Sequence, residues 1–131
     1  MQTRDAQPLP ARARGDRGAA TMLAAALLTP LFVVLMFAAV QMALWGHART
    51  TARVAARDAA AQVARFGVDS ADAKASAKAN LAGGDLRGID VSISNGSEIV
   101  TVTITGTAPG IIIGTSRPVS VTEAVPVEGR T

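Results

Sequence analysis

One uninterrupted apolar run near the N-terminus constrains this chain more than any other feature. Residues 23–40 are eighteen in a row, only one of them polar, and no charged side chain lies between Arg17 and His47. Because the hydrocarbon core of a bilayer takes about 20 apolar residues of helix, the run predicts a transmembrane helix over residues 19–46. It is also longer than the core of about 7–15 residues that a removable secretory signal carries. The sequence therefore predicts a lasting single-pass anchor in the cell membrane.

The remaining residues of the 131 divide into three segments by composition. Residues 1–18 form a polar tail without apolar periodicity, for which we expect disorder. Alanine dominates residues 47–82, which favours helix, whereas Val, Ile and Thr dominate residues 83–131 and favour strands. The part outside the bilayer is too short for a large enzyme core. The absence of cysteine excludes disulfides and thiolate metal sites.

The alanine-rich segment predicts two helices. Positions at spacings of three and four give the first helix an apolar stripe, whose members are Ala48, Ala52, Ala55, Ala59, Val63 and Phe66. Gly67 ends this pattern, and either Asp69 or Ser70 would cap a second helix that ends before Gly83. The spacing gives the second helix a face of small residues at Ala71, Ala75 and Ala79.

The distal segment changes to a period of two, which predicts three strands. Apolar residues alternate with polar ones over residues 89–94, 100–105 and 119–127. Asn95-Gly96 between the first two runs is a strong hairpin signal, and a loop over residues 106–118 leads to the third. Glu123 interrupts the valine face of that strand, where a bulge would accommodate it. The predicted fold class is α+β, with a transmembrane helix continuing into an amphipathic helix that packs on a small three-stranded antiparallel sheet.

The charged residues give no support to a nucleic-acid interface. Arginines flank the apolar run on both sides, where they would solvate the helix ends and meet lipid headgroups. Residues 89–131 carry four acids against two arginines and offer no basic face. Aromatic residues do not alternate with the arginines, so we expect no nucleic acid as a partner.

Three stretches resemble the TadE-like proteins of the tight-adherence pilus system, a branch of the type IV pilin-like proteins. They are the leader end Arg17-Gly18, the Leu28-Thr29-Pro30 step within the apolar run, and Val40-Gln41 at its far end. The resemblance covers residues 14–65 and implies that a prepilin peptidase cuts on the cytoplasmic side, between Gly18 and Ala19. It also implies other pilin-like subunits and pilus assembly machinery as partners, and an extracytoplasmic C-terminal domain.

One position departs from the family pattern. Where the resemblance implies a glutamate five residues after the cut, this chain has Leu23. In the family that glutamate pairs with the free amine of a neighbouring subunit, so its absence predicts a minor or accessory component. We expect the transmembrane helix to pack against other helices at its small residues and at its proline and glutamine. These residues are Ala24, Ala25, Pro30, Ala38 and Gln41.

No set of residues predicts an enzyme or a cofactor site. His47 is the single histidine and lies at the predicted membrane interface without a second ligand at helical spacing. Asp69 and Asp72 are three apart, but carboxylates at a helix start are explained by the helix dipole. We therefore expect no catalytic residue, no metal and no cofactor.

The sequence leaves two questions open. Ile111, Ile112 and Ile113 lie between glycines, and two interpretations of them remain: a part of the core over the sheet, or an exposed contact for a partner. For the whole chain, the first functional hypothesis is a pilin-like structural or assembly component of a pilus or secretion apparatus. The alternative is a generic single-span membrane protein whose small exported domain scaffolds or binds an envelope partner.

Overall fold

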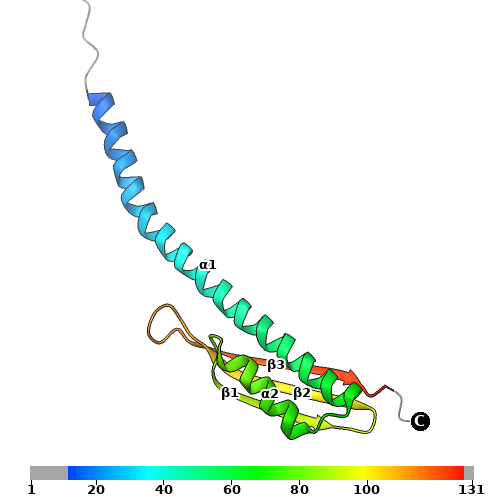
Figure 1. The fold of residues 1–131 in the computed structure, drawn as a ribbon. Helices are drawn as coiled ribbons and strands as arrows, with labels where there is room; N and C mark the ends of the chain where they lie inside the picture. Colours follow the sequence, from blue (N-terminus) through cyan, green and yellow to red (C-terminus); the bar gives the residue numbers. More distant parts are fainter. Residues whose placement is uncertain (1–11, 129–131) are drawn as a thin grey trace, which may run out of the picture. The chain divides into compact units, whose positions relative to one another are not determined.

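A computed structural model describes residues 12–128, and side chains from residue 15 onward. The chain contains a long helix α1 (Arg12–Phe66), a shorter helix α2 (Ser70–Ala82), and the strands β1 (Arg87–Asn95), β2 (Ile99–Ala108) and β3 (Arg117–Pro126). This order confirms the predicted α+β fold (Figure 1). The chain forms two compact units, the first ending at Ala38 and the second starting at Ala39.

The long helix begins earlier than the sequence predicted. α1 starts at Arg12, so the last residues of the expected polar tail, 12–18, are helical, whereas residues 1–11 lie outside the described part. Pro30 lies inside α1 without ending it. Since proline lacks a backbone N–H, it leaves the carbonyl of the residue four positions earlier without its helical donor. One residue before it, the Thr29 hydroxyl donates to the Ala25 carbonyl at 2.6 Å.

The alanine-rich half of α1 is buried over a wider arc than the predicted stripe. The stripe residues from Ala48 to Val63 are buried as expected, but Phe66 at the helix end is 78% exposed, so its place in the stripe is wrong. Ala56, Ala60 and Ala64 are buried as well and widen the face. They join the sheet and α2 in one hydrophobic core. Small side chains on α1 allow a close approach of the neighbouring elements.

The second helix has the predicted ends but a different buried face. Asp69 is the N-cap, and its carboxylate accepts a hydrogen bond from the Ala71 N–H at 3.2 Å, while Gly83 is the C-cap. The buried residues are Ala73, Ala77 and Leu81. The predicted face, which includes Ala71, is exposed. Both faces have helical spacing and consist mainly of alanine, so only the large buried side chain of Leu81 distinguishes them.

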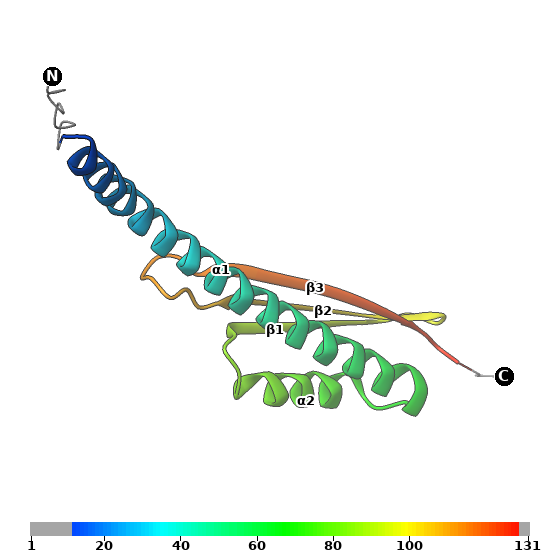
Figure 2. The same cartoon turned by 90° about the horizontal axis from the view of Figure 1, so that it is seen from above.

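The three strands form one antiparallel sheet in the order β1-β2-β3 (Figure 2). The sheet has one apolar face. The residues that alternate toward the helices are buried, and the threonines and serines between them face outward. The buried members are Val91 on β1, Val100, Val102, Ile104 and Ala108 on β2, and Val119, Val121 and Val125 on β3. The prediction of the valine face is confirmed.

The β1–β2 hairpin forms at the predicted place but with a different turn. The described residues contain no non-glycine residue with positive φ, and Gly96 does not have positive φ either. The Gly96 N–H instead donates to the Ile99 carbonyl at 3.0 Å. A Cβ at Gly96 would lie 2.7 Å from that carbonyl oxygen. Glycine is therefore needed here for close backbone approach and not for a left-handed conformation.

The predicted bulge at Glu123 is wrong. β2 and β3 pair without interruption from Ile99↔Pro126 to Ala108↔Arg117. The irregularity lies in β1, where the register shifts between Arg87 and Asp90. Gly88 lies between them with a φ of +60°, a conformation that costs glycine little.

We predict that charge on the buried face destroys the fold, whereas charge on the outer face does not. Val102 is fully buried, so Val102→Asp should lower the free energy of unfolding by about 4 kcal/mol or more. The control is Thr107→Asp, because Thr107 is exposed and pairs with Arg87 across the sheet. Thermal unfolding of the full chain in detergent measures both variants. Equal losses would contradict the assignment of the faces.

Candidate membrane-anchoring and docking site

The N-terminal unit consists of the apolar part of α1, and its large side chains are exposed. Leu23 is 64% exposed, Phe32 64% and Met36 55%, and no residue from 15 to 40 is buried. Among the described residues, α1 is the one helix long and apolar enough to cross a membrane. A long apolar helix whose large side chains are exposed fits a lipid environment. The small residues Ala24, Ala25 and Ala38 are exposed on it too.

Gln41, the first polar residue after the apolar run, holds a loop of the second unit. Its side-chain oxygen accepts a hydrogen bond from the Ile111 N–H at 2.9 Å, and its amide nitrogen donates to the Thr115 carbonyl at 3.3 Å. The sequence predicted Gln41 as a transmembrane packing residue. The structure gives it a second, intramolecular role, which the pattern of one helix did not reveal.

The loop that Gln41 binds, residues 109–116, has its own tight turn. Thr115 turns back on Ile112, whose carbonyl accepts from the Thr115 N–H at 3.0 Å and from its hydroxyl at 2.6 Å. A Cβ at Gly110 would collide with Thr115, so glycine is required there. The three isoleucines of this loop are exposed, at 44% for Ile111, 58% for Ile112 and 104% for Ile113. The core interpretation of these residues is therefore wrong.

Trp45 ties the same end of the sheet to α1. Its indole N–H donates to the Pro118 carbonyl at 3.4 Å, and the Arg49 guanidinium lies 5.4 Å from the centre of its ring. Tryptophan with an adjacent arginine is typical of the interface between lipid and water. Trp45 and Gln41 lie one helical turn apart, so the loop follows α1 over that turn.

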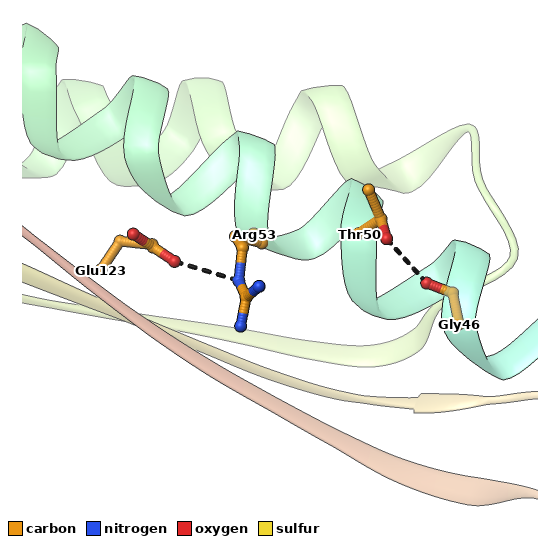
Figure 3. A network of polar contacts seen from close by, with 4 residues as sticks. All are labelled: Gly46, Thr50, Arg53 and Glu123. Atoms are coloured by element: carbon orange, nitrogen blue, oxygen red, sulfur yellow. Dashed lines mark hydrogen bonds and ion pairs between the residues drawn. The ribbon is translucent and has the colours of Figure 1, made fainter.

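Arg53 and Glu123 form an ion pair between α1 and β3 (Figure 3). The Arg53 Nε lies 3.1 Å from the Glu123 Oε1, and the side chains are 58% and 26% exposed. Glu123 occupies the buried face opposite Val102, so its carboxylate needs a polar partner there. The pair explains why no bulge is required. The sequence signalled it only through the acid within the valine face.

A groove beside this ion pair separates α1 from the end of β3. Its volume is about 490 Å³, and the charged side chains lining it are Arg57, Asp58, Arg65 and Glu123. Both signs of charge are present, which favours a polar contact over a pocket for an apolar ligand.

The candidates for chemistry do not come together in one place. His47 is exposed on α1, Asp69 caps α2, and Asp72 lies in the first turn of α2, as helix-start carboxylates do. Within residues 15–128, no group of three His, Cys, Asp or Glu side chains lies close enough to hold a metal.

The predicted processing residues Gly18 and Ala19 both lie in α1 and are exposed. A Cβ at Gly18 would meet no atom within 4 Å, and the same holds for Gly15. Neither glycine is therefore required by packing within the chain. A requirement for glycine at one of them and not at the other would have to come from a partner.

We predict that the Arg53–Glu123 pair contributes little to stability. A half-exposed pair has a coupling free energy of about 0.5 kcal/mol, which a double-mutant cycle with Arg53→Met and Glu123→Gln in thermal unfolding would measure. Glu123→Val should keep or raise the unfolding temperature, since it completes the valine face. A clear loss of stability in Glu123→Val would show that the carboxylate is essential to the fold.

Comparison with known proteins matches the segment that the sequence singled out. The family model described as TadE-like protein matches residues 18–61, from the predicted leader glycine through the apolar run and into the alanine-rich half of α1. Searches of curated proteins and of solved structures gave no significant match. The match confirms the resemblance and leaves the sheet outside it. Residues 18–61 of the chain are thus similar to TadE-like proteins.

Proposed function

We propose that this chain is a pilin-like structural or assembly component of a tight-adherence or type IV-type pilus or secretion apparatus. The observation that carries the proposal is the TadE-like match, which begins at Gly18 and includes the whole apolar run. A role in tight-adherence pilus assembly follows from that family. The alternative, a single-span protein whose exported domain scaffolds an envelope partner, would need the same anchor but no processing at Gly18.

The proposed orientation has the leader in the cytoplasm and the sheet outside. Charge alone does not decide it, because Arg17 precedes the apolar run and Arg49 and Arg53 follow it. The family resemblance supports this orientation, since prepilin peptidases cut on the cytoplasmic side. In this arrangement, the part of the second unit that follows the predicted transmembrane helix, from residue 47 onward, forms the extracytoplasmic domain.

Within the membrane, the proposed role is that of a minor subunit. Leu23 stands where a glutamate would pair with a neighbour's amine, and leucine in lipid needs no partner. Ala24, Ala25 and Ala38 expose small side chains that allow close contact with another transmembrane helix. Pro30 leaves a carbonyl without its helical donor, and a polar group of a neighbouring helix would supply one.

Processing after Gly18 is the first test. In cells with a prepilin peptidase, the mature protein should begin at Ala19, as measured by intact mass. Gly18→Leu should abolish the shortened form, because the bulky side chain would not fit the peptidase.

Gly15→Leu is the matched control and should be processed normally. Both positions have open space around a Cβ and lie in the same helix, so neither variant disturbs packing within the chain. A wild-type mass that retains residues 1–18 in such cells would favour the plain single-span alternative.

Polymerisation is the second test. Expressed with only its peptidase and assembly motor, the chain should form no pili in electron micrographs, because Leu23 cannot provide the intersubunit charge pair. Abundant filaments of this chain alone would overturn the minor-subunit role and would mean that packing of small residues suffices for assembly.

A further inference from the structure

We propose that the loop of residues 109–116 is a second membrane contact, which inserts its isoleucines into the lipid interface. The inference rests on the proposed membrane span of α1. It assigns lipid as the contact of the exposed isoleucines in this loop. The carrying observation is the attachment of this loop to Gln41, at the point where the apolar run ends.

The level of the loop follows from its hydrogen bonds. Gln41 is the next residue after the run of residues 23–40, which is long enough to fill the hydrocarbon core. In a spanning helix, Gln41 therefore lies at the boundary between hydrocarbon and headgroups, and Trp45 lies about 6 Å further out at 1.5 Å per residue. Ile111 and Thr115 bind Gln41, and Pro118 binds Trp45. The loop thus reaches the hydrocarbon boundary.

The loop also has the composition of an inserted segment. Residues 99–116 contain no charged side chain, and all three isoleucines face away from the core. The Ile113 side chain at the tip is 104% exposed. Exposed isoleucines are unfavourable in water, and insertion into lipid removes their surface from it. Arg117 follows directly and would remain at headgroup level.

The loop at the other end of β2 supports the assignment by contrast. Gly96, Ser97 and Glu98 connect β1 to β2, and this loop has no apolar side chain. The two loops lie at opposite ends of β2, and only the one bound to Gln41 is apolar (Figure 2). An apolar loop that served only for nonspecific adhesion could lie at either end of β2. Continuity with the apolar run of α1 favours lipid over a protein partner.

Fluorescence quenching in lipid vesicles tests the proposal on the full chain. The chain has no cysteine, so single variants Ile113→Cys, Ser97→Cys and Phe37→Cys each carry one environment-sensitive dye. The vesicles for this test consist of phosphatidylcholine with a spin label near the headgroup, and iodide serves as the aqueous quencher. The Ile113 label should be quenched by the spin-labelled lipid, and its iodide quenching should be several-fold weaker than that of the Ser97 label.

The Phe37 label separates the two hypotheses, because it lies within the apolar run. If the Phe37 label is lipid-quenched and the Ile113 label is as open to iodide as the Ser97 label, the loop insertion is wrong and the span stands. If the Phe37 label is itself open to iodide, the span is wrong. Protection of the Ile113 label that disappears as the lipid-to-protein ratio rises would overturn the proposal in favour of contact with a second copy.

A second variant tests the positioning role of Gln41. Gln41→Leu removes both side-chain hydrogen bonds to the loop and places an apolar side chain at this position of α1. It should increase iodide quenching of the Ile113 label and leave the Phe37 label unchanged. An unchanged Ile113 label in this variant would show that Gln41 does not position the loop, and would remove the argument for its depth.

Discussion

The apolar face of the sheet packs against the alanines of α1, and the rest of the second unit depends on this contact. A sheet with one apolar face must bury that face against another element. Alanines at positions such as Ala52, Ala56 and Ala60, all fully buried, give α1 a broad and shallow surface for Val100, Val102 and Ile104. The same helix carries the apolar run, so the element that completes the core is also the anchor.

This dual use of α1 explains the polar contacts around it. Glu123 lies within the valine face, and Arg53 of α1 meets it with an ion pair instead of a distortion of the strand. Gln41 binds the loop that joins β2 to β3, and Trp45 binds Pro118 at the start of β3. Each contact fastens a segment distant in sequence to one helix. The sheet region and the end of the apolar run are thereby linked through α1 from residue 41 to residue 53.

For function, the chain combines a family pattern with a missing charge. The TadE-like match begins at Gly18, and the exposed apolar run that follows it, Leu23 included, carries no charge. A charged group in lipid is costly and is kept for a purpose. Under the proposed function, an apolar run without such a group favours a subunit that joins an assembly through its small residues. The exposed isoleucines would then contribute contact with the bilayer surface.

The sequence alone determined the elements that depend on local chemistry: the apolar run, the end of α1 before Gly67, the start of α2 at Asp69 or Ser70, and the alternating strands. Hydrophobic periodicity and helix capping are properties of residues close in sequence, so they can be recognised before the fold is known. Only the tertiary structure decided which alanines of α2 are buried, that Arg53 meets Glu123, and that Gln41 holds the isoleucine loop. These contacts join residues far apart in the chain, and no spacing rule encodes which of several equivalent faces will meet.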